Sequence, residues 1–466
     1  MGVKIREFNV NVIKTDHVVA AMLPMQEHCR RLPQSNLDLL LPPIDVGVFF
    51  CYQNPNTSGI LPTFWSFSSM VKVLKVSLAE TLVAYYPFAG ELVQNLAGEP
   101  EILCNNAGVD FIEAWADVEL KEINFYNPDE SIEGKLVPKK KHGVLAVQVI
   151  ELKCGGVVVA CTFDHRVADA YSANMFLASW AELAQSKPLS QPPSFQRSFL
   201  FPRRPSYYDP LIDSMYLPIS ALKQETTIID HDDHVISRIY YVKAEEIKCL
   251  QSLANCNNTK FTKLETFSAF LWKTIANGME KSQRNNHKNF KLGIVVNGRS
   301  RLSSGDEDKV KLLKGYFGNV ISIPFGEKKV KELKEKSLSW VASVAHEFLE
   351  NAVTKEHFLG LVDWVEKHRP EPALARIYAT NEDSPAVVVS SRFPVREIEF
   401  GWGEAVFGSY HFPWDGKSGY VMPMPSPKGN GDWIVYMHML KGQVDLVEAD
   451  ASNVFKPLTA EYLNLK

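Results

Sequence analysis

The sequence predicts an α+β fold in which mixed sheets are flanked by helices. Short apolar runs rich in β-branched residues and bounded by glycine, such as 156–162, are typical of buried strands. Longer stretches with apolar residues three and four positions apart, such as 170–184, are typical of amphipathic helices. Strands and helices do not alternate in a strict βα repeat, which argues against a simple dinucleotide-binding fold. The 466 residues leave room for two or three domains, each with its own core.

In the first part of the chain, the pattern of apolar residues predicts several strands and two helices. Strands are expected at 46–52, 100–104, 109–115, 144–152 and 156–162. The last two are expected to form a hairpin, because Lys153-Cys154-Gly155 supplies a short glycine-containing turn. Helices are expected at 70–85, where Pro87 ends the pattern, and at 170–184.

A proline-rich stretch divides the chain. Between 185 and 226 periodicity is weak and the prolines are Pro188, Pro192, Pro193, Pro202, Pro205, Pro210 and Pro218. We therefore expect an N-terminal domain at 1–190, a linker at 191–226 that crosses a surface, and a C-terminal domain at 227–466. The second domain predicts strands at 235–242, 292–296 and 320–324 and helices from 244, at 263–277, at 337–352 and at 357–367.

Composition excludes several classes of function. With 45% hydrophobic and 22% charged residues and a net charge of −4, the chain does not resemble a general nucleic-acid or membrane-surface binder. No secretory signal or apolar run of membrane-spanning length is present in the sequence, and seven cysteines are scattered without CxxC pairing. There is no glycine-rich nucleotide fingerprint. We expect a cytoplasmic protein with no nucleic acid or membrane partner.

Two polar clusters could hold ligands but favour ordinary loops. His231-Asp232-Asp233-His234 has metal-ligand residue types, but all four stand in one polar turn with no second cluster nearby, so no metal site is expected. Lysines gather at Lys135, Lys139, Lys140 and Lys141 and could attract coenzyme A phosphates. Such a cluster is more often a solvated loop.

His165 stands where a predicted strand ends and a helix is about to begin. Strand ends of this kind project side chains into crevices, and an imidazole exchanges protons near neutral pH. Asp169 follows four residues later and could orient the ring or pair with an arginine. From these residues alone, a structural histidine is the more common outcome.

Two motifs change that balance. His165-x-x-x-Asp169 and Glu399-Phe400-Gly401-Trp402-Gly403 lie about half a chain length apart. In this order they resemble the His-x-x-x-Asp and Asp-Phe-Gly-Trp-Gly signatures of the plant BAHD acyltransferases. Further segments similar to that family are Leu37-Asp38, 86–90, 297–301 and 316–319. The resemblance covers essentially the whole chain.

The resemblance implies a fold, an activity and a co-substrate. The expected fold has two similar-sized, chloramphenicol acetyltransferase-like domains with a tunnel between them, joined by a crossover near 391–411. The expected activity is transfer of an acyl group from acyl-CoA to an alcohol or amine. Acyl-CoA is then a co-substrate, no cofactor is permanently bound, and the protein is expected to be a monomer.

The resemblance also assigns roles to residues. His165 becomes the general base. Asp169 and Glu399 are expected to pair with Arg299 or Arg301, because a buried unpaired carboxylate is costly. The turn of Gly401, Trp402 and Gly403 is expected to be structural and distant from His165, and Arg392 is expected to contact coenzyme A.

A covalent alternative would acylate Cys161 or Ser172 first. No Gly-x-Ser-x-Gly turn surrounds Ser172, and Cys161 lies within a predicted strand, so direct transfer is favoured.

The sequence departs from the family pattern at several points. Glu399 replaces the usual aspartate, Glu404-Ala405 replaces a basic residue and proline, and the segment before Arg392 lacks the Thr-Ser-Trp of members that acylate shikimate. Segments at 23–28, 104–111, 161–176 and 419–427 are similar to members that acetylate a phenylpropenyl alcohol. We therefore expect acetyl-CoA and coniferyl alcohol as substrates. Hydroxycinnamoyl or benzoyl donors, shikimate, quinate or amine acceptors, and a non-catalytic binding protein are the alternatives.

Overall fold

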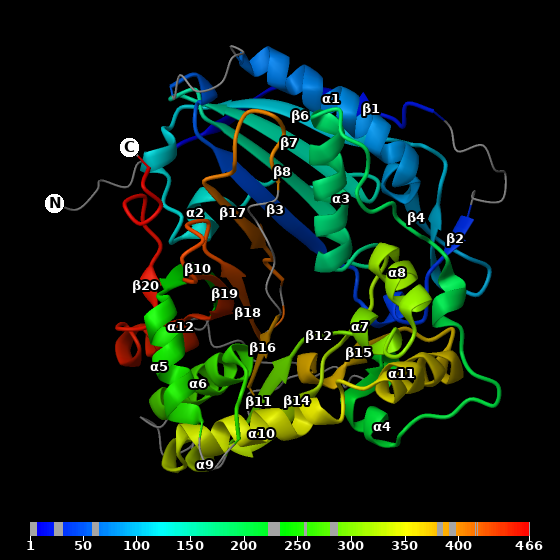
Figure 1. Cartoon of the computed structure of the whole chain (residues 1–466), viewed down its shortest axis with the longest axis vertical. Helices are drawn as coiled ribbons and strands as arrows, with labels where there is room; N and C mark the ends of the chain where they lie inside the picture. The colour runs from blue at the N-terminus through cyan, green and yellow to red at the C-terminus, as the bar shows by residue number, and fades with distance from the viewer. Residues whose placement is uncertain are drawn as a thin grey trace.

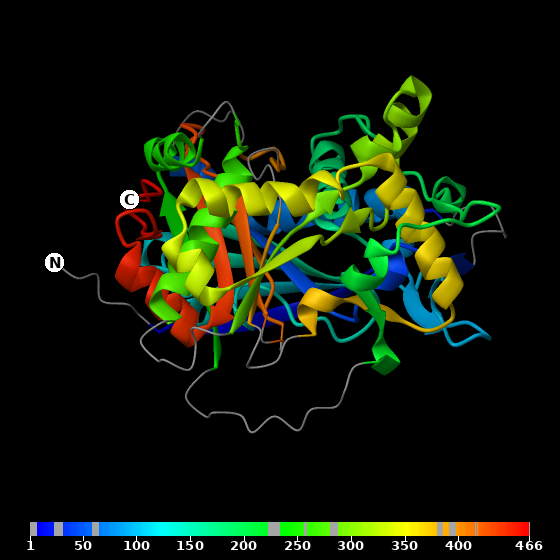
Figure 2. The ribbon, with the colours of Figure 1, turned by 90° about the horizontal axis from the view of Figure 1, so that it is seen from below.

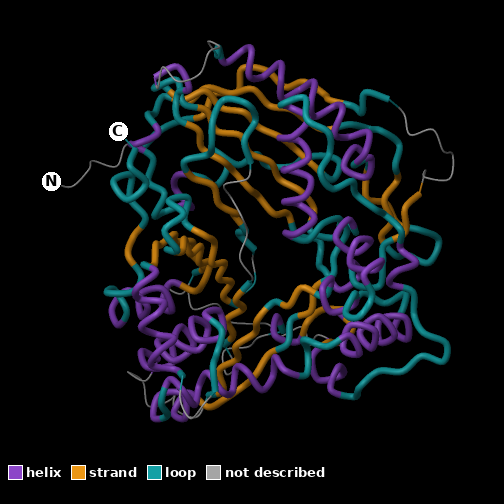
Figure 3. Tube along the Cα trace, in the orientation of Figure 1, coloured by secondary structure: helices purple, strands orange, loops and turns teal. Residues whose placement is uncertain are grey.

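A computed structural model describes residues 7–22, 31–57, 65–221, 234–255, 259–279, 288–379, 385–390, 398–414, 416 and 418–465. Two mixed β-sheets, each covered by helices, make up its two halves (Figure 1, Figure 3). The predicted α+β class is confirmed.

The first sheet has six strands and carries the predicted hairpin. Its spatial order is β1 (Val10–Val18), β6 (Val109–Ala116), β7 (Leu145–Leu152), β8 (Val157–Asp164), β3 (Asp45–Tyr52) and β17 (Phe407–His411). Strands β7 and β8 pair antiparallel, and β6 with β7 is the parallel pair. All eight residues of β8 are buried, which explains why this strand is a continuous apolar run rather than an alternating one.

Helices α1 (Phe67–Ala84) and α3 (Ala170–Ala184) pack together on one face of this sheet (Figure 1). Helix α1 begins at a Ser66 capping box and buries Leu74, Leu78 and Leu82, the stripe that its periodicity predicts. A small sheet lies nearby, formed by β2 (Arg31–Pro33), β5 (Pro100–Leu103) and β4 (Glu91–Gln94), and α2 (Pro128–Ser131) precedes β7.

The second sheet has seven strands. Its order is β14 (Phe325–Lys329), β11 (Asn289–Ile294), β16 (Ala386–Val389), β18 (Gly419–Pro425), β19 (Trp433–Leu440), β10 (Val235–Val242) and β20 (Lys456–Pro457). The helices packed with it are α5 (Ala244–Ala254), α6 (Lys263–Gly278), α9 (Val330–Glu335), α10 (Leu338–Glu350) and α12 (Lys441–Asp450). Figure 2 shows α10 running across its strands. The apolar stripe of α6 forms part of this core, as its spacing predicts.

A third cluster of apolar residues fills the space between the second sheet and the region around 191–221. Its elements are α4 (Leu211–Met215), α7 (Arg299–Leu302), α8 (Glu307–Gly315), α11 (Lys355–His368), and the strand pairs β9 (Tyr216–Pro218) with β15 (Ala373–Ala375) and β12 (Val296–Asn297) with β13 (Ile321–Ser322). The proline-rich stretch is therefore more structured than its composition suggests, because Ile212, Tyr216 and Leu217 are buried.

The chain crosses between the sheets near its C-terminal end. Strand β17 pairs with β3 in the first sheet. Seven residues separate it from β18, which pairs with β16 and β19 in the second sheet. Within the described residues, no helix has the length and apolar character needed to cross a membrane.

Candidate active site

The turn between β8 and α3 places His165 at the centre of the molecule. Asp164 closes β8, and its carboxylate accepts hydrogen bonds from the Arg166 backbone and from the Arg166 guanidinium, at 3.0 and 2.7–2.9 Å. Asp169 is the N-cap of α3 and accepts from the Ser172 N–H at 2.9 Å. These local bonds hold His165 in a short turn between a buried strand and a capped helix.

The surroundings of the His165 imidazole favour its neutral form, which can act as a base. Nδ1 of the ring is buried, and the residue lines the cavity between the two halves. Burial lowers the pKa of His165 below its usual value, because desolvation disfavours the charged ring; the nearby Asp169 and Asp164 carboxylates oppose this only in part. At neutral pH the ring is therefore uncharged and can accept a proton.

Asp169 does not contact the imidazole; it joins the two halves of the protein. Its carboxylate receives Arg299 Nη1 at 2.7 Å and Nη2 at 3.2 Å, and the Val320 N–H at 3.0 Å. Both side chains are almost fully buried. Desolvation raises the pKa of Asp169, but the Arg299 charge and the hydrogen bonds outweigh it, so that the pKa is lowered and the group stays ionised.

The two arginines offered by the sequence have different roles. Arg299 is buried and also bonds Ser172 Oγ and the Gly318 carbonyl, whereas Arg301 is exposed and has no described ion pair. On helix α7, residues two positions apart point away from each other, so only one of the two can reach Asp169.

The predicted pairing of Glu399 with an arginine is not found among the described residues. Instead its Oε1 accepts the N–H groups of Gly401 and Gly403, at 2.7 and 3.1 Å. Both glycines have positive φ angles, 110° and 113°, a conformation that side chains disfavour. Glu399 therefore stabilises its own turn.

That turn lies at the far end of α3 from His165. Phe400 packs against Trp180 and Trp402 against Tyr52, while Gln185 bonds the Glu399 carbonyl. Because α3 is 15 residues long, the turn is about 20 Å from the histidine. The geometry is that of a structural element.

A second support beneath His165 comes from Asn319 and Asp38. Asn319 Nδ2 donates to the His165 carbonyl at 2.9 Å and to Asp38 Oδ1 at 2.9 Å, and its backbone N–H also bonds Asp38. These bonds, with that of Val320 to Asp169, take backbone donors away from the sheet and shorten the predicted strand at 320–324 to β13. The sequence had marked both segments only by resemblance, without a role.

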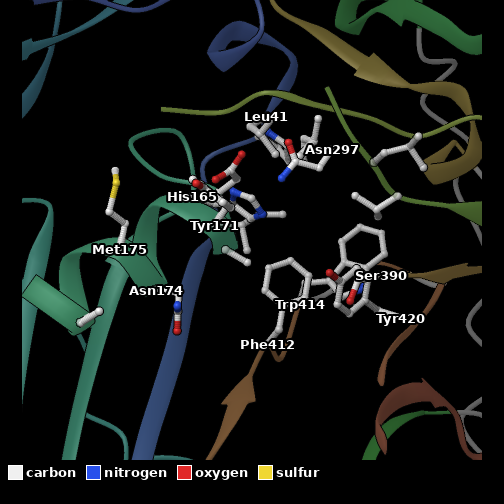
Figure 4. A pocket seen from close by; sticks show the side chains of 18 of the residues that line it. Leu41, His165, Tyr171, Asn174, Met175, Asn297, Ser390, Phe412, Trp414 and Tyr420 are labelled. Atoms are coloured by element: carbon white, nitrogen blue, oxygen red, sulfur yellow. The ribbon is translucent and has the colours of Figure 1, made fainter. Parts of the chain in front are cut away.

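A cavity of about 400 Å³ opens beside His165 and lies between the two halves. Tyr171, Asn174 and Met175 from α3 lie on one side of the histidine, and Phe412, Trp414 and Tyr420 lie on the other (Figure 4). The Phe412 ring meets the imidazole edge to face, with centroids 6.1 Å apart. Among the described lining residues there is no lysine or arginine; the lining includes His165 and Asp169, whose carboxylate is paired with Arg299.

Neither alternative nucleophile fits the geometry. Cys161 is buried within β8, and burial raises the pKa of its thiol to about 12, so thiolate is scarce. Ser172 is fully buried, and its hydroxyl is held by Arg299 and by the Gly318 carbonyl. Direct transfer remains as the chemistry that the site supports.

The lysine cluster does not form one basic surface. Lys140 is mostly buried and pairs with Asp45 at 3.2 Å, and Lys139 approaches Glu133 at 3.9 Å. Lys135 lies over the Phe8 ring. Arg392 and residues 231–233 lie outside the described residues. Within the described residues, no group of three His, Cys, Asp or Glu side chains could hold a metal ion.

Comparison with known proteins assigns the fold and the family. The Transferase family model matches residues 8–454. A shikimate O-hydroxycinnamoyltransferase from Nicotiana tabacum is 28% identical over 428 residues, which cover 88% of this chain and 92% of that protein. The vinorine synthase structure superposes with a TM-score of 0.70 at 19% identity, covering 96% of this chain and 99% of that one. The F. graminearum TRI101 structure with coenzyme A and T-2 mycotoxin gives 0.70 at 13%, covering 91% and 99%.

These likenesses confirm the predicted chloramphenicol acetyltransferase-like fold. The family match spans nearly the whole chain and includes both signatures. The chain therefore belongs to the Transferase family and is an acyl-CoA-dependent acyltransferase of the BAHD type that its two signatures resemble.

Proposed function

We propose that the protein transfers an acetyl group from acetyl-CoA to the hydroxyl of a neutral aromatic alcohol, with coniferyl alcohol as the leading acceptor. The observation that carries this proposal is the aromatic cavity beside His165, whose described lining contains no lysine or arginine. Its volume of about 400 Å³ lies within the range of roughly 300–1,000 Å³ that small-molecule sites occupy.

The lining argues for a neutral acceptor. A carboxylate such as that of shikimate, once removed from water, needs a cationic or multiply hydrogen-bonded partner. The described wall offers instead the rings of Tyr378, Phe412, Trp414 and Tyr420, against which an aromatic acceptor can pack. The related tobacco protein is named for shikimate, so the acceptor is the property on which the two chains are expected to differ.

The coenzyme is supported by the family and by the TRI101 complex, which contains coenzyme A in the same fold. In the proposed reaction, Nε2 of His165 removes the proton of the acceptor hydroxyl as its oxygen attacks the thioester carbonyl. The carbonyl becomes a tetrahedral oxyanion. Collapse breaks the carbon–sulfur bond, and the proton on His165 passes to the leaving sulfur. The products are the ester and free coenzyme A.

This chemistry needs little beyond His165 and correct placement. A thiol has a pKa of about 8.5, so the thiolate leaves with modest assistance. Orientation of the two substrates in one cavity supplies a large part of the rate. The Asp169–Arg299 pair and the Asn319 bond contribute by fixing the backbone on either side of the histidine.

The pH dependence should report the depressed pKa of His165. The neutral imidazole is the active form, and burial lowers its pKa below the ordinary value of about 6.5. Activity should therefore be fully present above that value and fall only as the pH drops through the lowered pKa. The measurement is kcat/KM for the acceptor as a function of pH, which reports the pKa of the essential group in the free enzyme. An acid limb at or above pH 7 would contradict the assigned environment of His165.

The acceptor is tested by a substrate panel. We expect kcat/KM for coniferyl alcohol, followed by cinnamyl alcohol, to exceed that for shikimate or an aliphatic amine, with free coenzyme A as the readout. Acetyl-CoA and p-coumaroyl-CoA serve as the two donors. A preference for shikimate of tenfold or more, about 1.4 kcal/mol in transition-state binding, would refute the neutral-alcohol assignment. If none of the acceptors in the panel led to release of coenzyme A, the proposed reaction as a whole would be contradicted.

A further inference from the structure

Two aromatic residues in the connection between β17 and β18 have backbone hydrogen-bond partners outside the cavity. Phe412 and Trp414 line the cavity but belong to no strand, because β17 ends at His411 and β18 begins at Gly419. Their backbone groups therefore lack ladder partners, and buried backbone groups must be satisfied in some other way. Three side chains of the second sheet provide this.

A chain of hydrogen bonds runs from one residue to the other. The Phe412 N–H donates to the Tyr436 hydroxyl at 3.1 Å, and that hydroxyl donates to Ser237 Oγ at 3.3 Å. Ser237 Oγ lies 2.9 Å from His438 Nδ1, and His438 Nε2 lies 3.0 Å from the Trp414 carbonyl oxygen. The path begins and ends on the wall of the cavity.

The proton positions in this chain follow from its ends. A carbonyl oxygen can only accept, so His438 Nε2 carries a proton; in the neutral form of the ring Nδ1 is then an acceptor. Ser237 must then donate to Nδ1, and it accepts from Tyr436. Desolvation raises the pKa of Tyr436, which keeps its hydroxyl protonated. The donor and acceptor of each hydrogen bond in this arrangement therefore depend on those of its neighbours.

The three side chains are well placed to be rigid. Tyr436 and His438 are two residues apart on β19 and so share one face, and Ser237 stands directly opposite His438 on β10. Tyr436 and Ser237 are fully buried and His438 is 5% exposed. None of the three lines the cavity.

We propose that Tyr436, Ser237 and His438 are positioning residues that fix the Phe412 and Trp414 rings beside His165 and thereby set which acceptors the cavity receives. The part that concerns acceptors rests on the proposed function. The physical basis is that loss of one bond leaves a buried donor or acceptor unpaired, which the connecting segment relieves by shifting.

The first test compares two tyrosine variants. Tyr436→Phe removes the hydroxyl from the chain, whereas Tyr240→Phe removes a buried hydroxyl that donates to Glu448 at 2.8 Å, on the neighbouring strand and away from the cavity. For Tyr436→Phe we expect the ratio of kcat/KM for coniferyl alcohol over hexanol to fall about tenfold, mainly through the KM of the aromatic acceptor, with the KM of acetyl-CoA unchanged. Tyr240→Phe should lower the Tm and leave the ratio unchanged.

A second measurement reads the position of the wall directly and does not require turnover. With 5-fluorotryptophan in the protein, the Trp414 fluorine signal, assigned by its absence in Trp414→Phe, should move in Tyr436→Phe and Ser237→Ala but not in Tyr240→Phe. His438→Gln, which keeps a donor for the Trp414 carbonyl, should move it less than His438→Ala.

The outcomes are distinct. An unmoved Trp414 signal in folded Tyr436→Phe overturns the positioning role, and a moved signal with an unchanged acceptor ratio overturns its effect on selectivity. Additive effects of Ser237→Ala and Tyr436→Phe on the signal would also overturn the positioning role. If the two residues act through one chain of hydrogen bonds, the second substitution should add little to the effect of the first. If the wild-type protein acylates no alcohol while the signal moves as expected, the proposed function fails and the positioning role stands.

Discussion

Replacement of His165 with alanine is expected to lower kcat/KM by about 10²–10⁴-fold while leaving the folded structure intact. The reason is that His165 lines the cavity, and burial lowers the pKa of its ring, which keeps the ring neutral so that it can accept the acceptor's proton. The bonds from Asn319 to the His165 carbonyl and from the Ser172 N–H to Asp169 hold this turn without the imidazole, so its loss should cost little stability. The measurement is the rate of coenzyme A release at saturating donor.

The control for His165→Ala is a second histidine in a different setting. His346→Ala removes a half-exposed ring on α10 that bonds Glu265, far from the cavity lining, and should leave the rate unchanged. The Tm of His165→Ala should match that of the wild type. Near-wild-type turnover in a folded His165→Ala protein would remove the histidine from the mechanism.

Much of the architecture could be predicted from local patterns, because those patterns correspond to burial. The apolar run at 156–162 is the fully buried β8. Of the expected stripe on α3, Phe176, Leu177 and Trp180 are buried and Leu183 is partly buried. The predicted helix at 263–277 is α6. The two helices have a clear periodicity and begin at the N-caps Asp169 and Thr262, and the strand is an uninterrupted apolar run that follows a glycine.

Long-range contacts could not be predicted in the same way. Nothing in residues 407–411 indicates that they pair with β3, more than 350 positions earlier, because strand pairing depends on tertiary contacts rather than on local preference. The bond of Glu399 to the glycines of its own turn could not be predicted either, since the cost of burying an unpaired carboxylate pointed to an ion pair with Arg299 or Arg301. Helical geometry could have separated Arg299 from Arg301 in advance.

The positioning chain has no sequence signature either. Ser237 and His438 are some 200 residues apart and meet only because β10 and β19 pair in one register. Asn319 and Asp38 are similar: the resemblance marked both, but their contact with the His165 backbone required the fold. Residues that touch the reacting groups could thus be named from the sequence, and those that hold them in place could not.

Asp169→Asn is expected to lower both stability and activity, because it breaks the buried ion pair that joins the two halves at the cavity. Removal of one partner from such a pair costs about 3–5 kcal/mol, since the charge of Arg299 is left buried without its counterion. The pKa of Asp169 is lowered in the folded protein, so its contribution is complete above the unfolded value of about 3.9 and is lost only as the pH falls through the folded value. Thermal unfolding at neutral pH should therefore show a Tm several degrees below that of the wild type.

The matched control for Asp169→Asn is Asp363→Asn, which breaks another buried carboxylate–arginine contact. Asp363 is 1% exposed and accepts from the Arg203 guanidinium at 2.7 Å, away from the cavity. It should lower the Tm and leave kcat for the folded fraction near the wild-type value. In Asp169→Asn, kcat should fall as well, because the start of α3 and the backbone of Val320 both depend on that carboxylate. If Asp169→Asn kept the wild-type Tm and yet was inactive, the carboxylate would have to act on the reacting groups directly.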